Sequence, residues 1–284
     1  MMHIVSTVKD MRQVIREVKV ENNTLGFVPT MGYLHEGHLS LIKRAKLEND
    51  IVIVSIFVNP TQFGANEDYD IYPKDFKRDK QLAETAGADY VFYPTVEEMY
   101  PTGYKTSVDV SEITDRLCGA SRPGHFKGVT TIVNKLFNIV EPNRAYFGLK
   151  DAQQVAVIQQ MVKDLFMNVE VIPCSIVRES DGLAMSSRNV YLTQQDRSAA
   201  LILSKSLMKA KKIINEGERD LKIIRNTIIE SISKEAPVSV EYIEIIQFPS
   251  LEKIDILEGK VLIALAAKVG RVRLIDNVIL EVQK

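Results

Sequence analysis

The sequence predicts an α/β protein with two domains, a doubly wound parallel sheet followed by a smaller α+β domain. Its 284 residues exceed the ~100–150 that are typical of one domain. Short apolar runs alternate with amphipathic stretches over residues 1–176, and such alternation implies parallel strands joined by right-handed crossovers. Over residues 177–284, two long amphipathic stretches precede three strand-like runs, so we place the domain boundary between residues 176 and 177.

The strands expected in the first domain are short and apolar. Residues 51–58 are rich in Ile and Val and apolar on both faces, which is typical of a central strand in a parallel sheet. Strands are predicted at residues 25–29, 51–58, 89–92 and 169–173, with another ending at Tyr146 and Phe147. Helices are predicted between them at residues 36–47, 76–86, 129–140 and 155–165. Gly87 and Pro142 end the second and third helices, because glycine suits the left-handed position after a helix and proline cannot continue one.

The second domain is expected to place two helices before three strands. Residues 203–214 and 224–232 carry apolar side chains at three- and four-residue spacing, and Gly217 ends the first helix. Gly270 supports a tight hairpin turn between the last two strands. The three strands are predicted at residues 238–246, 261–268 and 272–281.

The composition excludes several classes of protein. Lys plus Arg number 36 and Asp plus Glu number 37, so a net charge of −1 gives no reason to expect a nucleic-acid partner. The longest apolar runs, at residues 51–58 and 261–267, are far shorter than the ~20 residues that cross a bilayer. Cys118 and Cys174 match no metal-ligand spacing and fit the reduced thiols of a cytosolic protein. We therefore expect a soluble, cytoplasmic protein that binds neither nucleic acid nor membrane.

The segment Pro-Thr-Met-Gly-Tyr-Leu-His-Glu-Gly-His at residues 29–38 is the most informative in the chain. It follows a predicted strand and opens a helix, where free N–H groups and the helix dipole favour phosphate. Gly32 and Gly37 have the spacing of a Walker loop, but His38 replaces the lysine of that loop, which argues against a P-loop enzyme. His35 and His38 lie three residues apart rather than in an HExxH arrangement, so a zinc site also fits poorly. Their imidazoles, with pKa values ordinarily near neutrality, either bind and neutralise nucleotide phosphates or cap and pack the helix start.

This segment resembles the HIGH-type element of the nucleotidyltransferase superfamily, whose members have a Rossmann-like sheet. Four further segments make the resemblance specific. They are Phe-Val-Asn-Pro-Thr-Gln-Phe at 57–63, Arg-Pro-Gly-His-Phe at 122–126, Tyr-Phe-Gly-Leu-Lys-Asp-Ala-Gln-Gln at 146–154 and Met-Ser-Ser-Arg-Asn at 185–189. In this order, over almost the whole chain, they are similar to the pantothenate synthetase (pantoate–β-alanine ligase) family.

The resemblance implies an ATP-dependent condensation of (R)-pantoate with β-alanine to pantothenate, as part of coenzyme A biosynthesis. The pantoate carboxylate would attack the α-phosphorus of ATP and release pyrophosphate. The β-alanine amine would then attack the pantoyl adenylate and release AMP. Mg²⁺ accompanies ATP as substrate, and a homodimer formed through the N-terminal domain is implied as well.

The resemblance also assigns site residues. His38 and His35 are the catalytic candidates, as proton donors or phosphate-stabilising groups. Gln62 and Gln154 match the pantoate-binding glutamines, and Gln62 is also expected to contact β-alanine. The residues implied to bind ATP are Met31, Gly32, Tyr33, Leu34, His35, Glu36, Gly37, His38, Gly148, Leu149, Lys150, Asp151, Val177, Met185, Ser186, Ser187 and Arg188.

Several of these assignments have plain structural alternatives. Lys150 offers an ammonium to phosphates and Asp151 a carboxylate to the ribose, but the pair could also be an ordinary polar turn with Asp151 as the N-cap. Residues 185–188 could be a surface loop before the next helix. Asp75 and Asp79 could lie near Mg²⁺, although the family pattern is loose there and no protein metal ligand is assigned.

Two other functions share part of this pattern. A nucleotidyltransferase of the same superfamily would stop after nucleotide transfer, but it would not explain the two glutamines. A non-catalytic nucleotide-binding module would not need His35, His38, Lys150 and Arg188 together. Release of AMP that requires both pantoate and β-alanine would distinguish the ligase from both.

Overall fold

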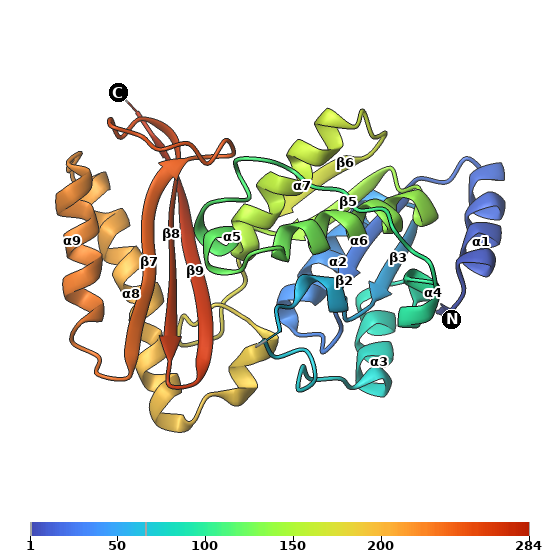
Figure 1. Ribbon diagram of the computed structural model, residues 1–284, viewed down its shortest axis with the longest axis horizontal. Coiled ribbons are helices and arrows are strands. Elements are labelled where there is room, and N and C mark those ends of the chain that lie inside the picture. The colour runs from blue at the N-terminus through green and yellow to red at the C-terminus, as the bar shows by residue number, and fades with distance from the viewer. Residues whose placement is uncertain (1, 66, 284) are drawn as a thin grey trace.

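The computed structural model describes residues 2–65 and 67–283, which form two sheets with their helices (Figure 1). The first sheet has six parallel strands in the order β1-β4-β3-β2-β5-β6, and we call it the parallel sheet. The second has three antiparallel strands in the order β7-β8-β9, and we call it the C-terminal sheet. The predicted fold class is confirmed.

The limits of the elements around the parallel sheet agree closely with the apolar runs of the sequence. The strands are β1 (His3–Val5), β2 (Leu25–Thr30), β3 (Ile51–Ile56), β4 (Tyr90–Phe92), β5 (Arg144–Gly148) and β6 (Glu170–Cys174). The α-helices are α1 (Val8–Val20), α2 (Glu36–Glu48), α3 (Phe76–Ala86), α4 (Val96–Met99), α5 (Leu117–Ser121), α6 (His125–Val140) and α7 (Ala152–Asp164). Short 3₁₀ turns are η1 (Pro60–Gln62), η2 (Leu149–Asp151) and η3 (Ser187–Tyr191). Gly87 has a φ of 101° after α3, as expected of a glycine that ends a helix.

The parallel sheet is covered on both faces. Helices α1, α6 and α7 pack on one face, where Met11, Phe137 and Ile158 belong to one buried cluster. Helices α2 and α3 pack on the other face, where Ile42 and Ala83 belong to a second cluster. Because both faces are buried, β2 and β3 are apolar along most of their length instead of alternating.

The strand order reverses beside β2. From β2 the chain moves outward through β3 to β4, and it then returns to β5 on the other side of β2. A reversal of this kind leaves a crevice at the carboxyl ends of the strands. The motifs at residues 29–38, 57–63 and 146–154 follow β2, β3 and β5, so the topology brings them together.

The C-terminal sheet lies between a pair of helices and the parallel-sheet region (Figure 1). Leu207 and Ile228 of the two helices are buried against one of its faces. Its other face contacts α7, where Leu262 packs with Ala152 and Ala156. Its elements are α8 (Gln194–Asn215), α9 (Leu221–Ile232), β7 (Val238–Gln247), β8 (Gly259–Val269) and β9 (Val272–Val282). At the predicted turn between β8 and β9, Gly270 has a φ of 56°.

Four elements are missing from the sequence-based prediction. β1, α4 and α5 span three, four and five residues, too few for a periodic pattern to emerge. α1 is different, because Met11, Ile15 and Val18 recur at helical spacing and Thr7 accepts the capping hydrogen bond of Asp10. That signal was present in the sequence.

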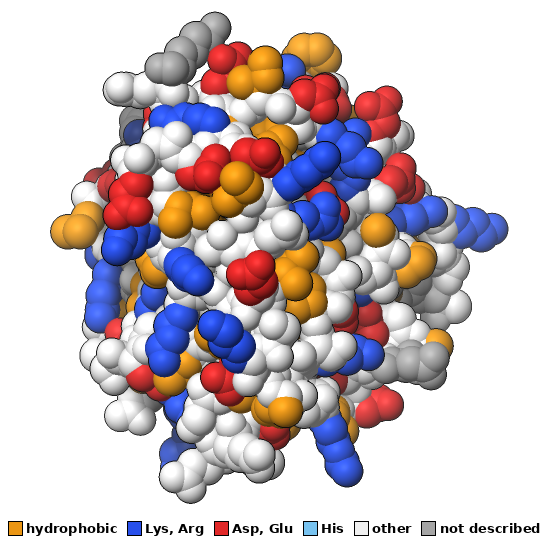
Figure 2. All heavy atoms as spheres, turned by 90° about the vertical axis from the view of Figure 1, so that its left-hand side faces the viewer, with side chains coloured by type: hydrophobic (Ala, Val, Ile, Leu, Met, Phe, Trp, Pro, Cys, Tyr) orange, Lys and Arg blue, Asp and Glu red, His pale blue; other side chains and the backbone are white. Residues whose placement is uncertain are grey.

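The outer surface beside α9 is of mixed charge. Figure 2 shows cationic and anionic side chains interspersed there, with apolar side chains scattered among them rather than gathered in one patch. Among the helices of residues 2–65 and 67–283, none has the length and apolarity needed to cross a membrane.

Candidate active site

A cavity of about 230 Å³ opens at the carboxyl ends of β2, β3 and β5. Most of the site residues named from the sequence line it, and they come from segments far apart in the chain. They are Met31, His35, Gly37, His38, Gln62, Gly148, Lys150, Asp151, Gln154, Val177, Met185, Ser186, Ser187 and Arg188. The fold thus converts five separate motifs into the wall of one cavity.

The structure places five residues implied to bind ATP outside this wall. The side chain of Leu34 is fully buried in the core between the parallel sheet and α2. Glu36 is exposed and lies 3.8 Å from the ammonium of Lys43. The other three are Gly32, Tyr33 and Leu149.

Gly32 and Tyr33 shape the loop that follows β2. Both have positive φ, 83° and 50°. A β-carbon on residue 32 would lie 3.0 Å from an oxygen of Asp79, so glycine suits this position on two counts. Asp79 is buried, and its two oxygens accept hydrogen bonds of 2.7 Å from the backbone N–H groups of Tyr33 and Leu34. The Asp79 carboxylate, which the sequence suggests as a neighbour of Mg²⁺, therefore orients this loop.

His35 and His38 cap the first turn of α2, each with one edge of its ring. Nδ1 of His35 accepts from the backbone N–H of Gly37 at 3.2 Å, and Nδ1 of His38 accepts from the backbone N–H of His35 at 3.3 Å. Because each Nδ1 accepts, we assign the proton of each neutral ring to Nε2. Helix capping, the structural alternative for these residues, is thus real, but it leaves both Nε2–H groups to donate to a ligand.

These two imidazoles are neutral at pH 7. Their rings stack with centroids 4.0 Å apart. Burial, followed by the charge of Lys150, lowers the pKa of His35 to about 4. Burial, with His35 and Lys150 acting in the same direction, holds the pKa of His38 well below its ordinary value. As they stand, the rings offer hydrogen bonds rather than the positive charge expected of a histidine that titrates near neutrality.

Lys150 and Asp151 follow β5 in the turn η2 and point to the same cavity. The ammonium of Lys150 lies 3.6 Å from an oxygen of Asp151. Asp151 occupies the N-cap position of α7, but its side chain makes no capping hydrogen bond. The capping alternative therefore does not hold for this carboxylate, which is 47% exposed beside Lys150.

Residues 177–188 form a hairpin with the following turn, and it closes the cavity from the side of the C-terminal sheet. The backbone N–H of Met185 donates to the carbonyl of Val177 at 3.0 Å. Oγ of Ser187 donates to the carbonyl of Tyr33 at 3.3 Å, which links the hairpin to the loop after β2. The segment is tied to the cavity wall, so it is not a free surface loop.

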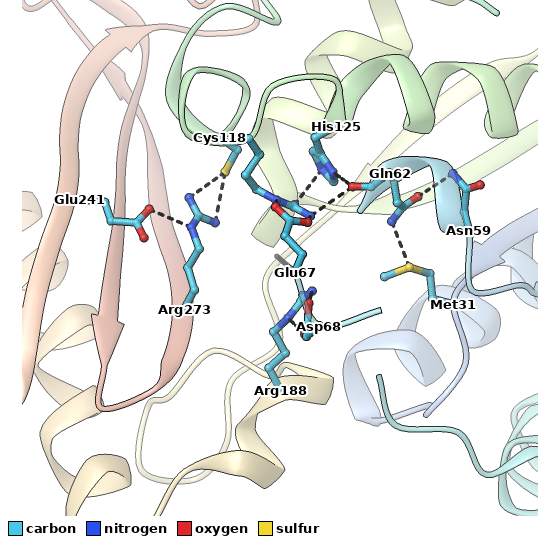
Figure 3. Close-up of polar contacts among 11 residues, drawn as sticks. Met31, Asn59, Gln62, Glu67, Asp68, Cys118, His125, Arg188, Glu241 and Arg273 are labelled. Atoms are coloured by element: carbon cyan, nitrogen blue, oxygen red, sulfur yellow. Dashed lines mark hydrogen bonds and ion pairs between the residues drawn. The ribbon is translucent and has the colours of Figure 1, made fainter. Parts of the chain in front are cut away.

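The guanidinium of Arg188 is held by a neighbouring carboxylate (Figure 3). Its Nε and Nη2 donate to the two oxygens of Asp68 at 2.7 and 2.9 Å, and it lies 5.7 Å from the ring centre of Tyr72. This paired geometry is also the one in which a guanidinium binds two phosphate oxygens. A phosphate at this place would take over the position of the Asp68 carboxylate.

The side-chain amide of Gln62 lies between Asn59 and Met31 (Figure 3). Its Oε1 accepts from Asn59 at 3.2 Å, and its Nε2 donates to the sulfur of Met31 at 3.0 Å. Asn59 is buried and also donates to the carbonyl of Gly128 at 3.1 Å. A β-carbon on residue 128 would lie 2.4 Å from the carbonyl oxygen of Thr61, so only glycine lets α6 approach η1 this closely.

A relay of three side chains holds the backbone of Gln62 (Figure 3). Nδ1–H of His125 donates to the Gln62 carbonyl at 2.8 Å, and Nε2 of the same ring accepts from Arg122 at 3.1 Å. Glu67 accepts from Nε of Arg122 at 2.6 Å. Burial, followed by the charge of Arg122, lowers the pKa of His125 to about 4. The sequence marks residues 122–126 as a motif but gives these side chains no role, because their common target becomes visible only in three dimensions.

A second, larger cavity of about 890 Å³ lies between the parallel-sheet region and the C-terminal sheet. Gln154 lines both cavities. The amide of its neighbour Gln153 instead accepts from the N–H of Cys118 and donates to the carbonyls of Ile113 and Arg116. The two cavities therefore join along a common wall. The residues that line both are Arg122, His125, Lys150, Asp151, Gln154, Ser186 and Arg188.

Known proteins share both the sequence and the fold of this chain. A family model described as pantoate-beta-alanine ligase matches residues 3–279. The pantothenate synthetase of Acetivibrio thermocellus is 61% identical over 281 residues, covering 99% of this chain and 100% of that protein. The pantothenate synthetase of Caldicellulosiruptor saccharolyticus is 58% identical over 281 residues, with 99% and 100% covered.

Two solved structures extend the likeness to three dimensions. The crystal structure of pantothenate synthetase from Thermus thermophilus has a TM-score of 0.94 and 43% identity, and all of both chains is covered. The crystal structure of pantoate-beta-alanine ligase from Francisella tularensis, complexed with beta-gamma ATP and beta-alanine, has a TM-score of 0.80 and 38% identity. That match covers 98% of this chain and 97% of the other.

Proposed function

This chain belongs to the pantoate–β-alanine ligase family and forms pantothenate by an ATP-dependent reaction, and we propose that it does so through a pantoyl adenylate in the cavity at the strand ends. In the first step an oxygen of the pantoate carboxylate bonds to the α-phosphorus of ATP, and pyrophosphate leaves. In the second step the β-alanine nitrogen bonds to the acyl carbon and loses a proton, and AMP leaves with the electron pair of the broken bond.

The observation that carries this proposal is that one cavity holds groups suited to both reactants. His35, His38 and Lys150 present donors for a triphosphate, and the amides of Gln62 and Gln154 present donors and acceptors for a hydroxy acid. All five residues line the same space of about 230 Å³. Holding the carboxylate and the α-phosphorus side by side removes much of the entropic barrier to their reaction.

The phosphate side of the cavity is prepared to stabilise developing charge. The two neutral imidazoles offer fixed Nε2–H donors, because capping of α2 holds their Nδ1 atoms. Lys150 adds a positive charge, and Arg188 adds another when phosphate oxygens replace Asp68. The two imidazoles, held in place by the helix cap, need no rearrangement as the pyrophosphate leaves. In this scheme Val177 contacts adenine through its backbone, and Asp151 contacts the ribose.

Mg²⁺ would enter as part of the ATP substrate. Among residues 2–65 and 67–283, no group of three or more His, Cys, Asp or Glu side chains is arranged to hold a metal ion. Mg²⁺ usually keeps several waters and is bound chiefly by phosphate oxygens, so it needs no dedicated cage of protein ligands. When bound, the ion neutralises part of the triphosphate charge.

The larger cavity supplies the route for the amine. It meets the smaller one along residues that include Lys150, Gln154 and Arg188, so β-alanine can reach the acyl carbon from the side of the C-terminal sheet. Gln62 lies near this junction because His125 and Arg122, which hold its carbonyl, line both cavities. This position supports its proposed contact with β-alanine as well as with pantoate.

Isotope exchange between pyrophosphate and ATP tests the adenylate. With ATP, Mg²⁺ and pantoate but no β-alanine, the enzyme should catalyse the exchange, because the first step needs no amine. AMP should accumulate at steady state only when β-alanine is added. An exchange that strictly requires β-alanine would refute the intermediate and indicate a concerted ligation.

Residues 1–176 act as the ATP- and pantoate-binding domain and residues 177–284 as a lid. The protein works in the cytoplasm, with no nucleic-acid or membrane partner. Two copies associate as a homodimer, so light scattering should give a mass of about twice 32.0 kDa.

A further inference from the structure

Strand β9 contains two consecutive buried polar residues, Asp276 and Asn277, that none of the proposed roles explains. They are 3% and 4% exposed. Asp and Asn are among the residue types depleted from strands. Since successive side chains point to opposite faces of a sheet, Asp276 shares the face of Leu274 and Val278, toward α8 and α9, while Asn277 faces the turn η2. Asp276 therefore interrupts an otherwise apolar face, whereas Asn277 lies between Ile275 and Ile279 at the centre of the other.

Asn277 binds the backbone of the turn that carries Lys150. Its Nδ2 donates to the carbonyl of Leu149 at 2.8 Å and to the carbonyl of Lys150 at 3.0 Å. Its Oδ1 is buried with no hydrogen-bond partner among the described residues. An unpaired buried acceptor lowers the stability of the folded protein. The side chain of Asn277 therefore binds this turn with both N–H groups at a cost in stability.

Asp276 binds the hairpin that carries Val177 and Met185. Its two oxygens accept from Nη1 and Nη2 of Arg178 at 2.7 and 2.9 Å. Arg178 pairs with Ala184 across the hairpin, directly beside the hydrogen bond between Val177 and Met185. The carboxylate therefore fixes the hairpin at its base.

We propose that Asp276 and Asn277 are positioning residues. Through them, the position of the C-terminal sheet determines the positions of two nucleotide-binding segments. Asn277 sets the turn of Lys150, and Asp276 sets the hairpin of Val177. The inference rests on the nucleotide roles proposed above for Lys150 and Val177. Because the two residues that make these hydrogen bonds are neighbours on one strand, any shift of β9 moves both segments together.

A double-mutant cycle tests the positioning of Lys150 by Asn277. Asn277→Ala should lower kcat for pyrophosphate exchange roughly tenfold, since two hydrogen bonds that place Lys150 are lost. In a Lys150→Ala background the same substitution should cost less than about twofold, because the group that it positions is already absent. A residue that only stabilised the fold would cost the same factor in both backgrounds.

The matched control is Arg116→Ala. Arg116 also joins the two sheet regions, through a hydrogen bond to the carbonyl of Leu251, but that bond touches no nucleotide-binding segment. This variant should lower Tm as Asn277→Ala does, yet change the exchange rate less than about twofold. If Asn277→Ala does not fold, Asn277→Ser, which keeps one donor, takes its place in the cycle.

The outcomes separate this inference from the proposed function. If Lys150→Ala alone exchanges at the wild-type rate, the phosphate role of Lys150 is wrong, and this inference falls with it. If Lys150→Ala is impaired but the loss from Asn277→Ala is undiminished in that background, only the inference is overturned. Wild-type exchange by Asn277→Ala would overturn it as well.

Asp276→Asn tests the positioning of the Val177 hairpin by Asp276. It keeps one acceptor for Arg178 but removes the charge that fixes the hairpin. We expect KM for ATP to rise about fivefold with kcat nearly unchanged, as when binding common to ground and transition states is lost. A fall in kcat with KM unchanged would overturn the assignment of Asp276 to the adenine-binding hairpin.

Discussion

The cavity holds three neutral imidazoles in two regions, and the regions present opposite edges of the ring. At the start of α2, His35 and His38 use Nδ1 to accept hydrogen bonds from backbone N–H groups, which leaves Nε2–H free to donate. At the start of α6, His125 uses Nδ1–H to donate to the Gln62 carbonyl, which leaves Nε2 as an acceptor for Arg122. Burial lowers the pKa in both regions, so all three rings stay neutral.

The difference shows that the backbone around a histidine decides what the ring can do. A ring before a helix meets unpaired N–H groups and becomes an acceptor at Nδ1. A ring whose Nδ1 faces a carbonyl must carry its proton on Nδ1. Because a neutral imidazole has only one N–H group, its Nε2 can then only accept. His35 and His38 are thus suited to contact a ligand directly, whereas His125 is suited to hold another residue.

The largest effect is expected from His38. His38→Ala should lower kcat for adenylate formation by roughly 10²–10³, the usual cost of removing one preorganised donor. The side-chain nitrogen of Gln lies near the place of Nε2 and that of Asn near Nδ1, so His38→Gln should retain more activity than His38→Asn. Pyrophosphate exchange measures this, with circular dichroism as the control for folding. Wild-type exchange by His38→Ala would contradict the role of this ring.

The glutamines should give the next largest effect, on the choice of acid. A buried amide left unpaired costs about 1–3 kcal/mol, so the wild type should discriminate strongly against a pantoate analogue that lacks the 2-hydroxyl. In Gln62→Ala or Gln154→Ala, activity with pantoate should fall and this discrimination should narrow, while ATP binding stays near normal. The measurement is kcat/KM for both acids. An unchanged preference in both variants would remove the glutamines as the groups that read pantoate.

His125 gives the inverse of the His38 series. His125→Asn keeps a donor near Nδ1 for the Gln62 carbonyl, whereas His125→Gln does not. We expect kcat/KM for pantoate to fall about tenfold in His125→Gln and clearly less in His125→Asn, with KM for ATP within about twofold in both. If Gln proved the better substitute at residue 125, the tautomer assigned to this ring would be wrong.

An effect of a different kind, on stability rather than activity, is expected from the dependence of stability on pH. The pKa values of His35 and His125 are about 4 in the folded protein, against an ordinary value of 6.5. Between these values the unfolded chain binds protons that the folded chain does not, so the free energy of unfolding should fall as pH falls from about 6.5 to about 4. Urea unfolding across this range measures the slope, which His125→Asn should reduce. An unchanged slope in that variant would argue that His125 is not held neutral.

Motifs and periodicity were sufficient to predict the class of sheet and most of the cavity wall. The apolar runs at β2, β3 and β5 and the polar motifs after them are local features, and parallel topology brings their ends together. The tautomer of His125 was not predictable, because its Nδ1 finds its acceptor on Gln62, 63 positions away in the chain. The hydrogen bonds from β9 to the two segments were also missed. The sequence did give a signal there, because Asp276 and Asn277 are disfavoured in strands and stand at the centre of an apolar run.

The pairing of Arg188 with Asp68 has a consequence for turnover. A half-buried guanidinium that loses its anionic partner is strongly destabilised. If phosphate oxygens displace Asp68 as proposed, the departing pyrophosphate does not leave Arg188 unpaired, because the carboxylate takes its place again. The ion pair thus lowers the gain from binding and the penalty for release by similar amounts. If Arg188 binds phosphate in this way, Asp68 would act as an internal competitor that keeps product inhibition weak, and Asp68→Asn would bind pyrophosphate more tightly while turning over more slowly.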